Sequence, residues 1–440
     1  MNGNHWLRPA VLLFCMMAAL AAVPCTATGP GNILTLDAAV REAVNNNPLI
    51  RQAVEKERAA IAAEKSAGAD LLPKFSASYS YNRLKETPYA VFGGVRLNIG
   101  AKDDFSWDVT VVQPLFAGFA LTTKREMALL GIDMQKTAME QAVLDVAAQA
   151  KVAYLRVLLA KKRLEVAREE VEQLEAHVHD AKQLYDQGMV PHNDLLKSQV
   201  ALAQARQGRV TAESDLEVAI SALNIALGRN VMEQTVVGDL PAFEPGVYNL
   251  PELFEKALKN RPELRQLKIA LKQAGLKVKL AGSSYYPTVS LIGRYEQTGD
   301  NARATNNDFG NFYNAVVGVQ AQWTFFQWGK TGADRANAIH EKAALEQKIK
   351  SVRDSVLLQV RQAFQDIMVA EKNIDTARKA LAQARENFRI TDLQYKAGTT
   401  TSTELLDART FLTQAEVNHY GALYGYRIAE AQLKRAVGEK

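Results

Sequence analysis

Cysteine is nearly absent from this sequence. Only Cys15 and Cys25 occur in 440 residues. Both lie in or beside an apolar N-terminal run, so we expect neither a disulfide framework nor a thiol site in the rest of the chain. One alternative stays open at Cys25, because a cysteine that follows an export signal can carry a lipid. Pro24 precedes it, however, where such signals have Gly or Ala.

An excess of charge of one sign is also lacking. The chain has 53 Lys and Arg residues against 48 Asp and Glu residues, which gives a net charge of +5. Because the two signs are interspersed along the chain, we expect no binding to nucleic acid.

Metal-ligand clusters and nucleophile motifs are missing as well. His177 and His179 stand two residues apart in a helical pattern, where side chains diverge. We therefore expect both to be solvated surface histidines rather than a pair of metal ligands. Ser, His and Asp residues are scattered without the spacing of a catalytic motif. The sequence predicts a protein that is not an enzyme and that has no catalytic residues, cofactor or bound metal.

Long hydrophobic runs are limited to the N-terminus. The run from Ala10 to Val23 has about 14 residues, fewer than the roughly 20 needed to span a membrane. Arg8 precedes this run, and small residues follow it at 25–27, as in an export signal. We predict that residues 1–27 are removed as a signal peptide and that the mature chain begins near Thr28.

Heptad spacing dominates the chain from about 121 to 227. One seam of apolar residues precedes a break at 188–193, and a second seam follows it, interrupted by Ser198 and Arg209. The first seam consists of Leu164, Ala167, Val171, Leu174, Val178, Ala181 and Tyr185. The roughly 65 residues before the break predict a rod about 100 Å long, which returns as a hairpin.

The chain is an internal repeat. Residues 36–81 align with 250–295 at a constant offset of 214, and later landmarks such as Gly188 and Gly398 differ by 210. We predict a first repeat at 28–230, a linker at 231–247 and a second repeat at 248–440. Each repeat is predicted to contain a first helix, two strands, a long helix and a return helix. In the first repeat, the first helix (about 36–71) and the return helix (about 193–227) together match the long helix in length, which predicts that the two are stacked end to end along it.

Four segments between the helices alternate apolar and small polar residues, as β-strands do. The apolar positions are Phe75, Ala77, Tyr79, Tyr81, Phe105, Trp107, Val109, Val111, Val289, Leu291, Gly293, Tyr295, Ala315, Val317, Val319, Ala321 and Trp323. The pattern suits a half-buried soluble strand or a strand between lipid and water. Transmembrane barrels start at about eight strands and tolerate no open edge, so membrane strands here require several chains in one barrel.

The mature chain resembles the TolC family of outer-membrane efflux proteins over almost its whole length. The resemblance rests on the duplicated layout, on Gln113-Pro114-Leu115-Phe116 with Gly118, and on two similar hairpin breaks. The breaks read Tyr185-x-x-Gly188 followed by Asp194-Leu195-Leu196, and Tyr395-x-x-Gly398 followed by Glu404-Leu405-Leu406. The second strand exit, Trp323-Thr324-Phe325-Phe326, departs from the pattern because it lacks proline.

The resemblance implies a mainly α-helical chain with membrane β-strands. It further implies a homotrimer with a 12-stranded outer-membrane barrel, four strands per chain, continued by a periplasmic coiled-coil barrel of 12 helices. Such a trimer is a passive exit duct that meets a periplasmic adaptor protein and an inner-membrane pump, in a tripartite efflux pump or a type I secretion system.

The hairpin breaks contain the predicted site residues. Gly188 and Gly398 follow the last seam tyrosines, where a helix ends on a residue that tolerates positive φ. The predicted adaptor-contact residues are Gly188, Pro191, Leu195, Leu196, Gly398, Thr399, Leu405 and Leu406. The two leucines Leu195 and Leu405 have seam packing as their alternative role.

Carboxylates at the breaks are the predicted periplasmic gate. Glu404 and Asp407 share a helix face, so a trimer with this face inward gathers six carboxylates at the narrow end of the tube. The family resemblance assigns the constriction to these two residues and adds Tyr395; Asp194 occupies the matching place in the first hairpin, where helix capping is its other role. The family has a basic residue where this chain has Thr400, so the resemblance predicts either a weaker closed state than an ionic latch provides or one held by other contacts.

Two other classes of protein remain as alternatives. A periplasmic coiled-coil adaptor or binding module requires a β-rich domain of its own rather than two amphipathic strand pairs. A structural coiled-coil filament has no use for an export signal or for these strands. We expect an outer-membrane location, with the strands in lipid.

Overall fold

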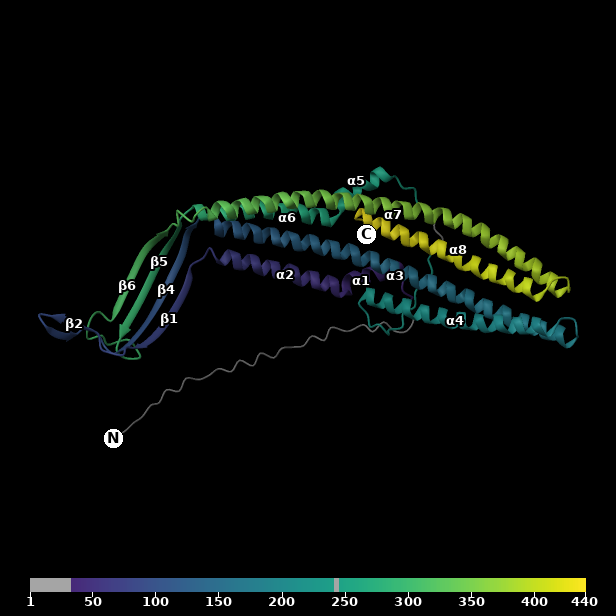
Figure 1. Cartoon of the computed structure of the whole chain (residues 1–440), viewed down its shortest axis with the longest axis horizontal. Coiled ribbons are helices and arrows are strands. Elements are labelled where there is room, and N and C mark those ends of the chain that lie inside the picture. Colours follow the sequence, from purple (N-terminus) through teal and green to yellow (C-terminus); the bar gives the residue numbers. More distant parts are fainter. Residues whose placement is uncertain (1–32, 241–244) are drawn as a thin grey trace, which may run out of the picture.

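The computed structural model describes residues 33–240 and 245–440. The predicted signal residues, Thr28 and Cys25 lie outside the described residues. The chain forms a rod in which the helices run along one long axis (Figure 1). A β-sheet lies at one end, and the turns of the two helical hairpins lie at the other. None of the helices in the described ranges combines the length and hydrophobicity that a membrane-spanning helix needs.

The elements of the first repeat follow the predicted order. They are α1 (Leu36–Asn46), α2 (Pro48–Ala69), β1 (Lys74–Arg83), β2 (Tyr89–Phe92), β3 (Val95–Asn98), β4 (Asp103–Ala117), α3 (Ala120–Asp186) and α4 (His192–Leu227). The second repeat contains α5 (Leu250–Asn260), α6 (Pro262–Ala281), η1 (Gly282–Tyr285), β5 (Thr288–Gly299), β6 (Tyr313–Gln322), α7 (Lys330–Lys396) and α8 (Ser402–Val437). The predicted long helices are confirmed: α3 and α7 each have 67 residues, and α4 and α8 each have 36.

The prediction of one continuous helix over 36–71 is wrong. The chain breaks at Asn47, whose backbone is extended, and α2 begins at Pro48. Proline has no N–H for an intrahelical bond and disfavours helical geometry in the residue before it, so the break follows from the sequence. The same break recurs at Arg261 before Pro262. The hairpin of β2 and β3 in the β1–β4 connection was not predicted either.

Each break docks on the C-terminus of a return helix. Asn47 Nδ2 donates to the carbonyl of Ala226 at 2.9 Å, and Arg261 Nη1 donates to the carbonyl of Ala436 at 3.0 Å. These are equivalent bonds in the two repeats. They place α2 and α4 end to end along opposite halves of α3, as Figure 1 shows. The stacking predicted from helix lengths is therefore confirmed.

Apolar clusters hold the hairpins together. Near the middle of the rod, Tyr154 on α3 is fully buried, and its hydroxyl lies 2.8 Å from the Leu34 carbonyl and 2.7 Å from the Gly238 carbonyl. This contact ties the linker to one side of α3. Nearer the turns, Val171 and Leu174 of α3 pack against Leu202 and Ala205 of α4, as the seam predicts.

The four long strands form one antiparallel sheet in the order β1-β4-β5-β6. Its register separates the two faces. Phe75, Val111, Gly293 and Val317 make one cross-strand row, whereas Ser78, Asp108, Glu296 and Asn314 make a row on the opposite face. The predicted alternation is confirmed. In the part of the chain that the structure describes, β1 and β6 leave the two edges of the sheet unpaired.

Replacing Gly228 by alanine is expected to destabilise the fold by roughly 1–3 kcal/mol, because a left-handed backbone strains residues with a Cβ. Gly228 has φ +76°, and an added Cβ would lie 2.7 Å from the Asn46 carbonyl oxygen. Thermal unfolding followed by circular dichroism measures the change. The control is Gly208→Ala, within α4 and without atoms near an added Cβ, which is expected to stabilise the helix by about 1 kcal/mol. Equal effects of the two substitutions would contradict this role of Gly228.

Candidate functional site: the hairpin tips

Both hairpin tips, which we define as residues 184–196 and 394–406, end their long helices in the same way. Gly188 has φ +71° and Gly398 has φ +70°. The next N–H groups close the helices: Met189 donates to the Leu184 carbonyl and Thr399 to the Gln394 carbonyl, both at 2.9 Å. Among the residues that the structure describes, no atom lies within 4 Å of an added Cβ at either glycine. Positive φ rather than crowding therefore requires glycine, as the sequence predicts.

The return helices begin differently. In α8 the hydroxyl of Thr401 accepts a hydrogen bond from the Glu404 N–H at 3.3 Å, a cap that the sequence analysis missed. In α4 the preceding residue is Pro191, which makes no side-chain cap. Asp194 and Glu404 both lie in the first turn, where the helix dipole favours a carboxylate.

Exposure divides the predicted adaptor-contact residues. Leu195 and Leu405 are buried, with 6% and 4% of their surface exposed. Leu406 is half-buried beside the cluster of Leu174 and Leu202. The exposed members of the predicted set are Gly188, Pro191, Leu196, Gly398 and Thr399.

The predicted gate residues do not come together in one chain. Glu404 and Asp407 are exposed on the first two turns of α8. Tyr395 instead is 3% exposed on α7, and its burial raises the pKa of the phenol. Within the described part of the chain, no hydrogen bond joins the Tyr395 hydroxyl to either carboxylate.

The expectation for His177 is wrong, whereas His179 is exposed as predicted. His177 is 8% exposed because it sits where α3 meets α8. Its Nε2 lies 2.9 Å from the Ser402 hydroxyl and 3.0 Å from the Ser198 hydroxyl. The ring of Tyr395 packs edge-on at 4.9 Å. Ser198 was visible in the sequence as an interruption of the seam, and a buried polar interruption requires a polar partner.

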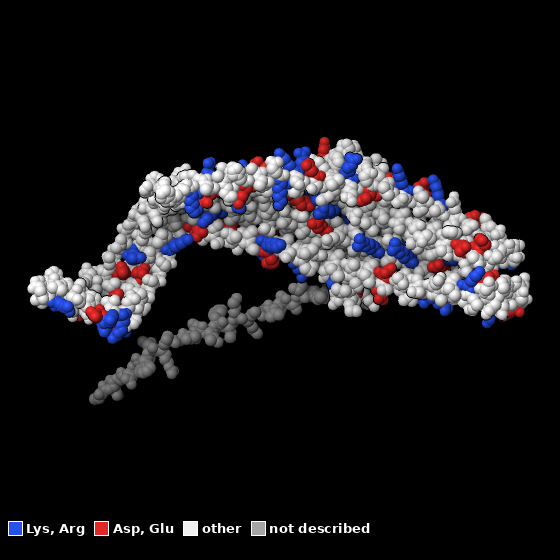
Figure 2. All heavy atoms as spheres, in the orientation of Figure 1, with Lys and Arg blue, Asp and Glu red and all other residues white. Residues whose placement is uncertain are grey.

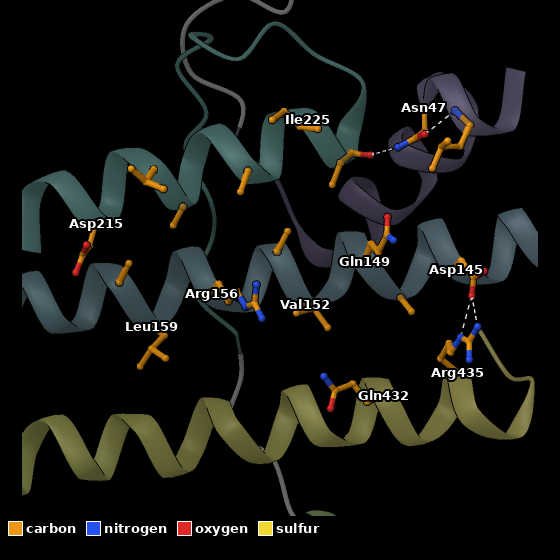
Figure 3. A pocket seen from close by; sticks show the side chains of 18 of the residues that line it. Asn47, Asp145, Gln149, Val152, Arg156, Leu159, Asp215, Ile225, Gln432 and Arg435 are labelled. Carbon is orange, nitrogen blue, oxygen red and sulfur yellow. Dashed lines mark hydrogen bonds and ion pairs between the residues drawn. The ribbon is translucent and has the colours of Figure 1, made fainter. Parts of the chain in front are cut away.

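The contact of α3 with α8 continues in polar pairs. Arg409 is 3% exposed, and its Nη1 donates to Gln173 Oε1 at 2.6 Å. Burial lowers the pKa of this guanidinium. Toward the sheet, Arg435 pairs with Asp145 at 2.8 Å, as Figure 3 shows. The second hairpin thus sits on the first through hydrogen bonds and an ion pair as well as apolar packing.

A groove of about 1270 Å³ opens beside this contact, between α4 and α8 over α3. Gln149, Val152 and Arg156 of α3 form its floor, and Asp215 and Gln432 belong to its walls (Figure 3). The linker covers the other side of α3, at Tyr154 and Lys161. One face of the hairpin pair is therefore covered by the linker. The opposite face is open, and its groove is lined by apolar side chains such as Val152 and Leu159 together with polar ones such as Arg156.

Known proteins with similar sequences come from several bacteria. The chain is 25% identical over 407 residues to the outer membrane protein TolC of Vibrio cholerae, a match that covers 90% of this chain and 89% of that protein. It is 24% identical over 417 residues to the alkaline protease secretion protein AprF of Pseudomonas aeruginosa, with 90% and 82% covered.

Solved structures share the fold. The CmeC outer membrane channel of Campylobacter jejuni superposes with a TM-score of 0.79 at 19% identity, over 92% of this chain and 85% of that chain. The outer-membrane channel OprN gives a TM-score of 0.77 at 21% identity, over 92% and 90%.

A model of the family described as outer membrane efflux protein matches residues 39–229 and 253–439. These two segments contain nearly all of the helices and strands described above, in both repeats. The chain belongs to the outer membrane efflux protein family.

Proposed function

We propose that this protein is the outer-membrane exit duct of a tripartite efflux pump or a type I secretion system. Substrates pass through it from the periplasm to the outside without chemical change. The observation that carries the proposal is a four-stranded sheet with one apolar face, one polar face and two unpaired edges, joined to helices of 67 residues.

The sheet has the properties of part of a barrel wall. Lipid tolerates no unpaired strand edge, so copies of the chain must pair β6 of one with β1 of the next. Three copies supply 12 strands, above the minimum of about eight for closure. The β6–α7 connection adds an exposed aromatic stretch, in which Phe325 is 82% and Trp328 is 89% exposed. Figure 2 shows few charged side chains where the sheet meets the helices. Aromatic belts of this kind lie at membrane surfaces.

The internal repeat supports a specific packing between copies. Within one chain, Ser402, Arg409 and Arg435 of α8 contact α3. Their counterparts in α4, 210 positions earlier, are His192, Gln199 and Ile225, which are all exposed. The face of α4 that carries these three residues is equivalent to the face of α8 that contacts α3. Because it is exposed in one chain, it can pack against a second copy.

The complementary stripe lies on α7. His177, Gln173 and Asp145 of α3 receive α8, and their counterparts on α7 are Asn387, Gln383 and Ser355, again all exposed. We propose that α4 of one copy packs on α7 of the next in the register that α8 and α3 use within a chain. This register places His192 beside Asn387 and Gln199 beside Gln383, and both pairs can form hydrogen bonds.

In such a ring the linker covers the outside, and the opposite face, with the groove of Figure 3, faces the passage. The narrow end lies at the hairpin tips, where Glu404 and Asp407 of three copies gather six carboxylates that attract cations. Because Thr400 replaces a basic residue, the closed state depends on other contacts, among them the buried ring of Tyr395.

The tips are also the proposed contact with a periplasmic adaptor protein, which links the duct to an inner-membrane pump. Pro191, Leu196 and Thr399, together with Gly188 and Gly398, are the exposed candidates. Leu195 and Leu405 act indirectly, by holding each tip in shape.

Extraction and conductance test the proposed function. Detergent should release the protein from outer membranes as a heat-labile trimer, and the trimer should form pores in planar bilayers. A water-soluble monomer without pore activity would contradict the proposal.

Cross-linking tests the register between copies. In a background without Cys15 and Cys25, Gln199→Cys with Gln383→Cys should yield dimers and trimers with a short bifunctional thiol reagent. The matched control, Gln173→Cys with Arg409→Cys, should cross-link within one chain and leave the monomer band unshifted. The opposite pattern, or equal ladders from both pairs, would rule out this register.

Removal of the tip carboxylates tests the gate. Glu404→Ala with Asp407→Ala should raise single-channel conductance or weaken block by cations, by roughly twofold or more, because fewer negative charges line the narrow end. Planar bilayer recordings measure both effects. The control is Asp375→Ala with Glu386→Ala, two exposed carboxylates paired with bases on their own helix. Currents unchanged from wild type would remove the gate assignment.

A further inference from the structure

One imidazole lies where the ends of four helices meet. His177 of α3, Ser198 of α4, Tyr395 of α7 and Ser402 of α8 are 8%, 0%, 3% and 0% exposed. We call these four residues the tip joint. Through His177, Ser198 and Ser402, both hairpins contribute buried polar side chains to one hydrogen-bonded group. The ring of Tyr395 packs beside it.

The tip joint admits one continuous chain of hydrogen bonds. His177 Nε2–H donates to the Ser402 hydroxyl at 2.9 Å, and the Ser402 hydroxyl donates to Ser198 Oγ at 3.1 Å. The Ser198 hydroxyl then donates to the carbonyl of Asp194 at 2.9 Å. Each of these three donors has an acceptor, so the hydrogen-bonded residues His177, Ser402 and Ser198 fix α8 relative to α3 and α4.

The repeat does not reproduce this chemistry elsewhere. The counterparts of His177 and Ser198 in the second hairpin are Asn387 and Ala408. Asparagine does not titrate, and alanine has no hydroxyl to extend the chain. A titratable side chain thus occurs at the junction of the first hairpin with the second and at no equivalent place in the described second hairpin.

Charged groups surround the imidazole from all four helices. Asp180 lies on α3, Asp194 on α4, Asp392 and Lys396 on α7, and Arg409 on α8. Burial lowers the pKa of His177, and the carboxylates of Asp180, Asp392 and Asp194 oppose this effect without cancelling it. Lys396 forms an ion pair with Asp392 at 2.8 Å. Its positive charge reduces the amount by which the Asp392 carboxylate raises the pKa of His177.

The sign of the pH effect follows from this balance. When the hairpins are apart, His177 is exposed and titrates at the ordinary pKa of histidine, near 6.5. Because the pKa is lower when the hairpins are joined, the separated state binds the proton more tightly. The joint is fully stabilised above that ordinary pKa and weakens as the pH falls below it.

We infer that His177 is a proton-sensitive positioning residue that holds the second hairpin tip, with Glu404 and Asp407, against the first hairpin. Mild acid loosens this hold and frees the α7–α8 turn to move. The joint is a property of one chain, whereas its consequence for conductance rests on the proposed function.

Hydrogen exchange on the purified protein tests the inference. Between about pH 7.5 and about pH 5.5, wild-type peptides from 402–412 should lose protection by roughly threefold or more after correction for intrinsic exchange. His177→Asn and His177→Gln, which keep a polar group but do not titrate there, should show the same protection at both pH values. The control His179→Asn, two residues away and exposed, should keep the wild-type pH response.

Wild-type protection that does not change with pH would overturn the inference, and so would a wild-type pH response in both His177 variants. The exchange measurement needs no channel activity. Absence of pores in bilayers would therefore count against the proposed function while the result for the joint stands.

Discussion

The structure depends on partners along the whole length of two very long helices. A helix of 67 residues extends about 100 Å, and its stability in water comes from burying an apolar seam rather than from helix propensity. No single neighbour of ordinary length covers such a seam. The chain meets this requirement with two shorter helices placed end to end, α2 on one half of α3 and α4 on the other (Figure 1).

The junction between those shorter helices is built alike in the two repeats. Asn47 and Arg261 have different side chains, yet each donates a hydrogen bond to the carbonyl at the equivalent position of its return helix. Gly228 and Gly438 both adopt positive φ close to the preceding break. The donor side chain differs between the repeats because both asparagine and arginine reach the carbonyl. The left-handed backbone favours glycine, and glycine occurs at this position in both repeats.

The two hairpins differ where they meet neighbours. In the first hairpin, His177 and Gln173 form hydrogen bonds with α8 of the same chain. The equivalent residues of the second hairpin, Asn387 and Gln383, are exposed. This difference gives a duplicated chain two kinds of junction, one inside the chain and one proposed between chains. The one inside is buried and titratable, so it is the place at which a local change in charge acts on the tip that carries Glu404 and Asp407.

The sequence by itself determined the elements and their repetition. Heptad spacing predicted the long helices, alternation predicted the four strands, and glycine after the last seam tyrosine predicted both turns, because these signals depend on near neighbours in the chain. Pro48 was readable as a break and was overlooked. Only the tertiary structure decided that His177 is buried and that the ring of Tyr395 packs against it. Those outcomes depend on which side of α3 receives α8, a contact between segments more than 200 residues apart, and local spacing contains no information about that choice.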